Sequence, residues 1–578
     1  MNDVQRIQKG LQYLGYDAES VVFEKADCFY TETENGRKKV YYKELCDCYR
    51  GLYFSQEKTR KQSFERLGYL LDCSRGAVVK VEKVKEWIAT LACFGYNRLL
   101  LYTEDTYEIE SERYFGYKRG RYSMEEMSEI AAFAADFGVE IVPHIQTLAH
   151  LLQMLLWKEY NAVHDSFDVI KIGEEKTYEL IEKMVASVKK AYGCKTLHIG
   201  FDEAFCVGTG NRAKSMADMQ KSEMISYHLE RILSICDKYD LKLLLWHDMI
   251  VEHKLQLDER VQPVCWEYFS TDDNYYASLL SDTEKYCKEK PAFAGAVLKW
   301  NNLMPDNTFS IAQAKRIFNV YLQQGVKDFY LAGWGDNGAE CSHFAGLPTV
   351  AYYAQRKYGF DEVDERAFQA ITGVDYTDFF LLDKLNRILP EMVETDKNNY
   401  AKVLFYNDVF LGIYNEFAVD GLNVRYGALA KELQGKNFGK LQYMFDTAAT
   451  LADVLSLKAE LPVQLKKAYQ AGDRETLVRL VDVMRAVAKK TDTFYQVYNR
   501  QWNEENKSYG SEIYDIRLGG LIARTNRCAS ILAAYLDGKV DEIAELKEEH
   551  LKFDPHAEYK PYDYISYPWG NIVSACLL

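Results

Sequence analysis

Residues 196–205 read TLHIGFDEAF: a short apolar run, a glycine and a phenylalanine, then two adjacent acids, Asp202 and Glu203. A buried strand does not normally end in paired negative charges, because burial strips an ionised carboxylate of its hydration. The stretch indicates a strand that leaves the interior where two acids are needed. Which fold has such strand ends is decided by the runs around it.

Short apolar runs, each followed by an amphipathic helical stretch, repeat from residue 66 to about residue 360. The eight runs are GYLLDCS (68–74), RLLLYTED (98–105), EIVPHIQ (140–146), TLHIGFDE (196–203), KLLLWHD (242–248), QPVCWEYF (262–269), AGAVLKWN (294–301) and DFYLAGWGD (328–336). Eight β-α units predict an α/β fold of the (β/α)8, or TIM-barrel, type. A doubly wound open sheet is the structural alternative, but no G-x-G-x-x-G motif follows the first run.

The segments that flank the repeating units have different patterns. Residues 1–65 are predicted to form a small N-terminal α+β domain, with a helix in VQRIQKGLQYL and a strand hairpin at Asn35-Gly36. Residues 66–362 would be the barrel. Residues 363–578 show helical periodicity and predict a helical C-terminal domain. Its helices either pack on the barrel or form the interface of a homodimer.

Composition limits the partners and the compartment. The 578 residues carry a net charge of −15, with a pI of about 5.4, so neither nucleic acid nor an anionic membrane is expected as the main partner. The thirteen cysteines are scattered and form no C-x-x-C pair, as expected for free thiols in a reducing compartment. No signal-peptide core or membrane-length run is apparent, so the prediction is a cytoplasmic protein.

Polar and aromatic side chains gather at the carboxyl ends of the eight runs. They are Arg75, Asp105, His144, Asp202 with Glu203, Trp246 with Asp248, Trp266 with Tyr268, Trp300 with Asn301, and Trp334 with Asp336. In a TIM barrel the active site lies at that rim. Tryptophan faces pack on the C–H faces of sugar rings, and four of the eight tryptophans end the last four runs. The alternative is that each tryptophan fills the core between barrel and helices.

The adjacent acids impose a geometric condition. Neighbouring side chains of a regular strand point to opposite faces, so Asp202 and Glu203 share a pocket only if the strand ends and its pleat breaks there. The Gly-rich stretch AFCVGTGN that follows fits this condition. Two close, partly desolvated acids would raise the pKa of one of them and give a proton donor near neutral pH. The alternative is a helix N-cap or a solvated loop.

Four histidines near strand ends make a metal-dependent hydrolase a further alternative. They are His144, His150, His198 and His247. No H-x-H or H-E-x-x-H motif occurs, so no metal site is predicted.

Several motifs on the first four runs have the form of known signatures. HIGFDEAF (198–205) is similar to H-x-G-G-D-E, with Phe201 in place of the second glycine, and LLDCSRG (70–76) is similar to L-D-x-S-R-H. YNRLLLYTEDT is similar to a second-strand segment that ends in Asp-Asp, with Asp105 on the first acid. PHIQTLAH is similar to P-E-x-D-x-P-G-H, with His150 on its histidine.

The later runs continue the same series. Trp246 and Trp266 match fifth- and sixth-strand tryptophans, and Trp334 to Asp336 is similar to an eighth-strand W-G-E. In this order the motifs resemble those of glycoside hydrolase family 20, the β-N-acetylhexosaminidases, over roughly residues 66–345. The resemblance implies a TIM barrel, often preceded by a small α+β domain, and a small oligosaccharide or glycoconjugate as the substrate. Divergent bacterial-type intracellular members are the branch it resembles.

The resemblance also implies roles for the two acids. Glu203 would protonate the glycosidic oxygen and later activate water. The 2-acetamido carbonyl of the substrate would attack the anomeric carbon and form an oxazolinium ion, while Asp202 orients the acetamido N–H. This family is an exception to the scheme with a carboxylate nucleophile, so adjacent acids suffice. Retention of configuration is implied, and no cofactor is required.

Departures from the family pattern leave the sugar preference open. The family's hexosamine-binding arginine falls on Leu67, so Arg75 is the predicted replacement. The seventh-strand tyrosine that binds the acetamido oxygen falls near Asn301, and Asn301 or Tyr268 would supply that donor. The third-strand Glu and Asp become His144 and Gln146. The alternatives are a β-glycosidase with a relaxed acetamido requirement and a non-catalytic sugar-binding barrel.

Overall fold

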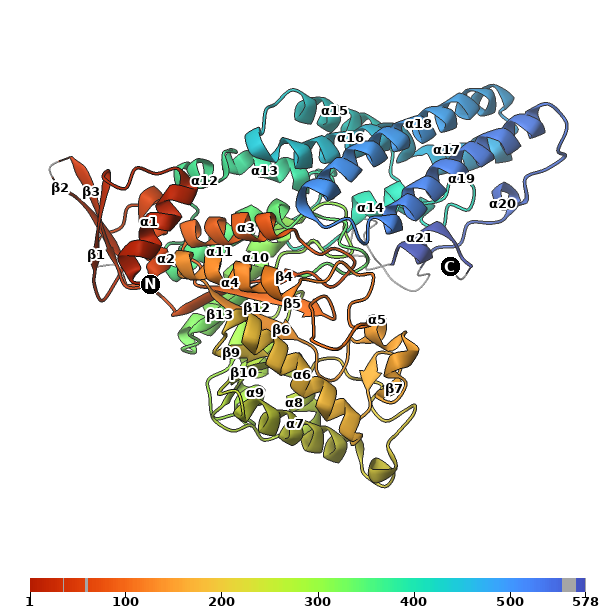
Figure 1. Ribbon diagram of the computed structural model, residues 1–578. Helices are drawn as coiled ribbons and strands as arrows, with labels where there is room; N and C mark the ends of the chain where they lie inside the picture. The colour runs from red at the N-terminus through yellow and green to blue at the C-terminus, as the bar shows by residue number, and fades with distance from the viewer. Residues whose placement is uncertain (35, 58–60, 554–567, 577–578) are drawn as a thin grey trace. The chain divides into compact units, whose positions relative to one another are not determined.

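The computed structural model describes residues 1–34, 36–57, 61–553 and 568–576 (Figure 1). The chain divides into two compact units. The first unit consists of Met1–Val297, Gln313–Trp334 and Thr349–Thr372, and the second of Leu298–Ala312, Gly335–Pro348 and Gly373–Leu578. Each unit is described by itself.

A closed barrel of eight parallel strands forms the centre of the first unit. The strands are β4 (Arg66–Asp72), β5 (Arg98–Glu104), β6 (Glu140–Ile145), β9 (Thr196–His198), β10 (Lys242–Trp246), β11 (Val261–Trp266), β12 (Ala292–Ala296) and β13 (Asp328–Gly333). They close in the order β10-β11-β12-β13-β4-β5-β6-β9, so each of the eight predicted runs supplies one strand. The (β/α)8 prediction is confirmed, and the open-sheet alternative is wrong.

Helices follow the barrel strands as the apolar spacing predicts. They are α3 (Val81–Phe94), α4 (Met124–Phe137), α6 (Glu175–Tyr192), α7 (Lys221–Asp237), α8 (Asp248–His253), α9 (Asp273–Glu284), α10 (Asn307–Gln323) and α11 (Leu347–Lys357). Helix α4 shows the expected signals at both ends. Ser123 and Glu126 form a capping box at its start, and Gly138, at φ +67°, ends it.

The interior of the barrel is packed with side chains from every second strand position. The buried cluster is Leu70, Leu100, Tyr102, Val142, Leu244, Trp246, Val264, Ala292, Ala294, Tyr330 and Ala332. Trp266 and Trp334 are partly buried against it. The polar ends of the strands therefore stand on a solid apolar floor rather than over an open pore.

The N-terminal part of the first unit is α+β, as predicted. It contains α1 (Asp3–Leu14), β1 (Val21–Lys25), β2 (Tyr30–Glu34), β3 (Arg37–Tyr42) and α2 (Leu45–Tyr53). Strand β3 pairs with β1 in parallel and with β2 as an antiparallel hairpin. Of the predicted turn residues, Asn35 lies outside the described residues.

The second unit is helical. After residue 362 the chain forms α12 (Glu365–Thr372), α13 (Tyr376–Asp383), α14 (Tyr400–Tyr406), α15 (Leu422–Gln434), α16 (Gln442–Lys458), α17 (Leu461–Ala471), α18 (Arg474–Glu505), α19 (Glu512–Leu536), α20 (Ala544–Lys547) and α21 (Trp569–Val573), of which α12 belongs to the first unit. The helical C-terminal region is thus confirmed. The predicted domain limits at residues 65 and 362 stay a prediction.

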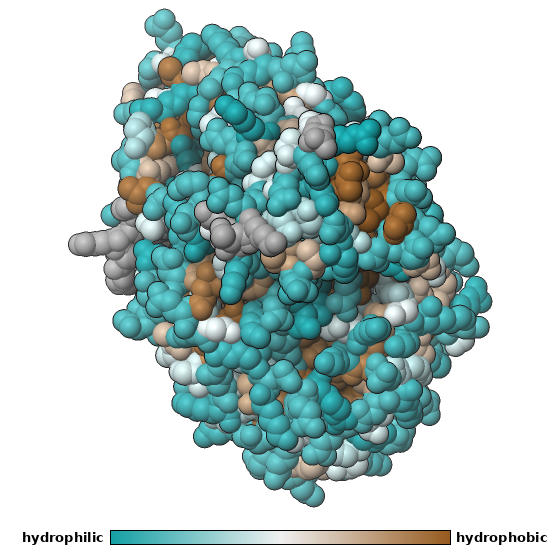
Figure 2. Space-filling model, turned by 90° about the vertical axis from the view of Figure 1, so that its left-hand side faces the viewer, coloured by the Kyte–Doolittle hydropathy of each residue, from teal (hydrophilic) through white to brown (hydrophobic). Residues whose placement is uncertain are grey.

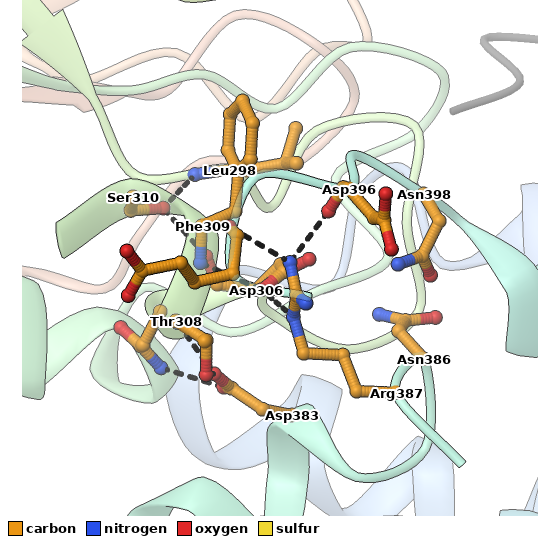
Figure 3. Close-up of polar contacts among 12 residues, drawn as sticks. Leu298, Asp306, Thr308, Phe309, Ser310, Asp383, Asn386, Arg387, Asp396 and Asn398 are labelled. Atoms are coloured by element: carbon orange, nitrogen blue, oxygen red, sulfur yellow. Dashed lines mark hydrogen bonds and ion pairs between the residues drawn. The ribbon is translucent and has the colours of Figure 1, made fainter. Parts of the chain in front are cut away.

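Buried acids hold the start of helix α10 within the second unit (Figure 3). The carboxylate of Asp306 accepts hydrogen bonds from the Phe309 N–H at 3.0 Å and from Arg387 Nε at 2.6 Å. Asp383 Oδ2 accepts from the Thr308 N–H at 2.7 Å and from its hydroxyl at 2.8 Å. Acids at a helix N-terminus satisfy its free N–H groups and complement the helix dipole, so this cluster has a structural explanation.

In the parts of the chain that are described, no helix is both long and apolar enough to cross a bilayer. Figure 2 shows a mainly hydrophilic face on which hydrophobic patches are small and separate.

Candidate active site

The chain leaves the barrel abruptly after β9. This strand ends at His198, and Gly200, Phe201 and Glu203 all have positive φ, at +71°, +74° and +48°. The pleat is therefore broken where the prediction required it. A Cβ on Gly200 would lie 2.0 Å from Gln146 Oε1, so only glycine allows the close approach of that amide.

The break brings both acids to one histidine. His150 Nε2 lies 3.1 Å from Asp202 Oδ2 and 3.7 Å from Glu203 Oε2. Burial alone would lower the pKa of His150, but the neighbouring Asp202 carboxylate raises it to about 9. Burial opposes ionisation of Asp202 as well, yet the His150 contact holds its pKa below the usual value. The Glu203 side chain remains 44% exposed.

A chain of hydrogen bonds runs from Asp202 through the buried interior to Arg75. Gln146 Nε2 donates to Asp202 Oδ1 at 2.9 Å and to Tyr102 Oη at 3.1 Å. Tyr102 Oη in turn donates to Glu104 Oε1 at 3.0 Å, and Arg75 Nη2 lies 3.3 Å from the same oxygen. Gln146, Tyr102 and Glu104 are buried, so their positions are fixed before any ligand arrives.

Asp248 is a third acid beside the pair. Its Oδ2 accepts the Glu203 backbone N–H at 2.8 Å, and its Oδ1 accepts from Trp266 Nε1 at 3.4 Å. Burial, reinforced by the Asp202 charge, raises the pKa of Asp248 to about 7. The carboxyl of Asp248 therefore holds a proton in mildly acidic solution while Asp202 is ionised.

Four aromatic residues predicted for the site lie together in the first unit. Trp246 is fully buried, with its ring centroid 5.9 Å from that of Trp334. The rings of Trp266 and Tyr268 stack at 5.4 Å, and Trp334 Nε1 donates to Tyr268 Oη at 3.0 Å. Trp246 thus belongs to the barrel floor, as the core-filling alternative had it, while the other three rings are only partly buried.

Asp105 and His144 are buried below the rim. Asp105 pairs with Arg119 Nε at 3.0 Å, and burial raises its pKa to about 6. The His144 ring stacks on His198 with a centroid separation of 3.7 Å, and burial lowers the pKa of both imidazoles. Asp105 is therefore bonded to a protein arginine, and the neutral His144 and His198 lie inside the barrel.

The remaining predicted residues, Trp300, Asn301 and Asp336, belong to the second unit. There the Asn301 N–H donates to the Asp336 carbonyl at 3.1 Å, and Asn399 Nδ2 donates to the Asn301 carbonyl at 3.3 Å. Asn301 has φ +55°. A sugar contact for these three residues stays a prediction.

The histidines do not assemble into a metal site. Over the described ranges, no group of three or more His, Cys, Asp or Glu side chains is arranged to hold a metal ion. His150 is paired with carboxylates, and His247 is buried with its pKa lowered to about 4.

From the sequence, Glu104 was not identified as a site residue, and Gln146 was identified only as a departure from the family pattern. Glu104, and not Asp105, faces Arg75, and Gln146 bonds directly to the catalytic candidate Asp202. Strand periodicity was the available signal. Leu100 and Tyr102 face the barrel interior, so the next inward position on the same strand is Glu104.

The sequence matches two family models. One, described as the glycosyl hydrolase family 20 catalytic domain, matches residues 64–280, and one described as the glycoside hydrolase 20C C-terminal domain matches residues 377–563. The barrel and the catalytic-domain match together define a glycoside hydrolase. More specifically, the chain belongs to glycoside hydrolase family 20.

Curated relatives agree with this assignment, and a solved structure shares the fold. Bovine Hexosaminidase D is 26% identical over 232 residues, which are 37% of this chain and 66% of the relative. Human Hexosaminidase D is 24% identical over 332 residues, 52% of this chain and 68% of the relative. The matches span about two thirds of these relatives. The Flavobacterium johnsoniae chitobiase structure aligns with a TM-score of 0.50 and 14% identity, over 94% of this chain and 89% of that one, and supports the fold.

Proposed function

We propose that the protein is an exo-acting β-N-acetylhexosaminidase that removes terminal β-linked GlcNAc or GalNAc by a substrate-assisted, retaining mechanism. The observation that carries the proposal is the broken strand end at which adjacent acids meet one histidine. Asp202 is held ionised by Gln146 and His150, whereas Glu203 is accessible to solvent. Fixed charge beside a reacting centre stabilises a transition state at no cost in reorganisation.

The two acids divide the chemistry between them. Glu203 donates its proton to the glycosidic oxygen while the acetamido carbonyl of the substrate attacks the anomeric carbon, and the leaving alcohol departs. Asp202 accepts the acetamido N–H and offsets the positive charge that develops on the oxazolinium ring. Glu203, now a carboxylate, takes a proton from water as the water opens that ring, so configuration is retained.

Other residues are proposed to hold the sugar. Arg75, fixed by Glu104, is suited to hydroxyl groups, and the partly buried Trp266 and Trp334 offer rings to the pyranose faces. Tyr268 is our candidate for the donor to the acetamido oxygen, because Trp334 Nε1 donates to its Oη and directs its own proton elsewhere.

Trp300, Asn301 and Asp336 are proposed as further sugar contacts. None of the thirteen cysteines, all of which lie within the described residues, forms a disulfide, which supports a reducing compartment such as the cytoplasm. A measurement of molecular mass in solution tests whether the protein forms a homodimer.

A substrate panel tests the proposal. Nitrophenyl β-glycosides of GlcNAc, GalNAc and glucose should be hydrolysed in the first two cases and not in the third, with retention visible by proton NMR. Glu203→Gln should lower kcat by roughly 100-fold or more while KM changes little. A Glu203→Gln variant that keeps near-normal kcat would show that Glu203 is not the acid. Release of nitrophenol from the glucoside, and from neither of the two acetamido sugars, would refute substrate assistance.

A further inference from the structure

Two phenylalanines on loops of the first unit are largely exposed. Phe205 is 65% exposed and Phe167 is 67% exposed, although Phe is normally among the more buried residue types. Both lie on loops at the carboxyl-terminal side of the barrel strands, after β9 and after β6 respectively.

Phe205 is held close to Glu203 by the local backbone. Its N–H donates to the Glu203 carbonyl at 2.7 Å, and its own carbonyl accepts from Lys221 Nζ at 3.1 Å. The residue between the two, Ala204, is fully buried and anchors the turn. Because only one residue separates them, the Cα atoms of Glu203 and Phe205 lie within about 7 Å.

Phe167 lies at the tip of a small hairpin formed by β7 (His164–Ser166) and β8 (Val169–Ile170). Its φ of +23° is unfavourable for a bulky side chain, and a two-residue turn normally carries glycine, asparagine or aspartate. Strain of this kind persists where the surroundings enforce it, and it concentrates at functional sites. The next residue, Asp168, accepts the His150 N–H at 3.2 Å, which ties the tip to the acid-bearing pocket.

The two loops are bonded to each other along their length. Ser166 Oγ donates to the Cys206 carbonyl at 2.6 Å, and the buried Asp165 carboxylate accepts the N–H groups of Gly208 at 2.6 Å and Gly210 at 3.2 Å. The Asn211 N–H donates to the Asp165 carbonyl at 2.8 Å. The rim that carries both rings is therefore a single cross-linked element, in which the backbone at both rings is held in place before a ligand binds.

We propose that Phe167 and Phe205 form the binding platform for the leaving-group sugar, with its apolar C–H face packed on the rings. This inference rests on the proposed function, since the leaving oxygen must lie at Glu203. Phe205 follows Glu203 by two residues and its N–H is bonded to the Glu203 carbonyl, so a ring attached to the leaving oxygen lies within reach of this rim. The preferred substrate is then a β-linked oligosaccharide with a pyranose next to the cleaved bond.

The test compares two substrates that share the terminal sugar. Diacetylchitobiose has a pyranose leaving group, and 2-acetamido-2-deoxy-β-glucosyl fluoride has none. Phe205→Ala and Phe167→Ala should each lower kcat/KM for the disaccharide about 3- to 10-fold and leave that for the fluoride within twofold. Phe205→Tyr keeps an aromatic ring and should retain the kcat/KM of the unmodified enzyme for the disaccharide. Tyr13→Ala, at an exposed aromatic residue of α1, is the matched control and should change neither value.

Three outcomes would overturn the inference. Equal losses on both substrates would mean that the rings support the fold of the site rather than the leaving group. An unchanged kcat/KM for the disaccharide in a protein that carries both Phe167→Ala and Phe205→Ala would mean that the rings make no contact with substrate. If the unmodified enzyme hydrolyses neither compound, the proposed function itself fails, and the platform fails with it.

Discussion

The backbone conformation of Phe201 predicts that glycine destabilises the protein less than alanine at this position, which is the reverse of the usual order. Its φ of +74° is a left-handed conformation that costs a residue with a Cβ about 1–2 kcal/mol relative to glycine. The side chain offsets this cost because it is fully buried, with its ring parallel to His228 at a centroid distance of 6.1 Å. Truncation of a buried phenylalanine to alanine costs about 3–5 kcal/mol.

Phe201→Gly should therefore be more stable than Phe201→Ala. Both variants lose the ring, but only alanine retains the backbone strain. The glycine variant is destabilised by roughly 0.4–1 kcal/mol because its unfolded chain has more conformational freedom. The free energy of unfolding should therefore be higher for the glycine variant than for the alanine variant by about 0.5–1 kcal/mol. At ordinary positions the order is reversed, because glycine costs roughly 0.5–1 kcal/mol relative to alanine inside a helix or strand.

A matched pair at another buried phenylalanine supplies the control. Phe329 is also fully buried but lies within strand β13 and has no positive φ, so Phe329→Ala should be more stable than Phe329→Gly. Urea unfolding followed by tryptophan fluorescence measures all four variants. The same order of alanine and glycine at both positions would refute the argument from backbone strain.

Two further predictions concern charge. Gln146→Glu places a carboxylate beside Asp202, which should raise the pKa of Asp202 and move the acid limb of the kcat/KM profile upward by about one pH unit or more. Gln146→Met removes only the amide hydrogen bond that lowers this pKa, so it should move the limb in the same direction but by less. An unmoved limb in Gln146→Glu would contradict the role of the amide. Burial raises the pKa of Asp248 from its ordinary value of 3.8 to about 7, so the folded state binds the proton more tightly than the unfolded chain. This contribution to stability is complete below about pH 4 and is lost as the pH rises through 7. The loss is at most about 4 kcal/mol by linkage, and urea midpoints at pH 5 and pH 8 should differ less in Asp248→Asn than in the unmodified protein; equal differences would contradict it.

The barrel was predictable because its signal is repeated. Each run combines a buried parallel strand with a polar end, and one uncertain run matters little when seven others share the pattern. The helical C-terminal region was likewise predictable from a 3.6-residue period alone. The division of the chain into two units was not, since residues 298–312 and 335–348 group with the helices although barrel strands precede them. Such grouping depends on contacts between segments far apart in sequence.

The residue types of the candidate site were predictable from the sequence, but the burial of each side chain was less predictable. Asp202, Glu203 and His150 meet, and Arg75 lies at the end of the hydrogen-bond chain from Asp202. Trp246 was placed at the correct strand end, but it is fully buried because the barrel interior is filled up to that level. The sequence does not encode how high the interior is filled, which depends on the sizes of side chains from eight different strands.

Backbone strain explains why periodicity loses its value at the strand ends. Positive φ values occur at Glu104, the last residue of β5, and beyond the ends of β6 and β9, at His150, Phe201 and Glu203. Each reverses the course of the chain, so the next side chain no longer points where the pleat would send it. At Glu203 this reversal places neighbouring acids on the same histidine, which a regular strand cannot do. Each such residue costs of order 1 kcal/mol or more, and the buried hydrogen bonds of Gln146, Tyr102 and Glu104 hold the strained ends in place. The features that make the strand ends hard to predict are therefore the ones that bring two consecutive acids to one histidine.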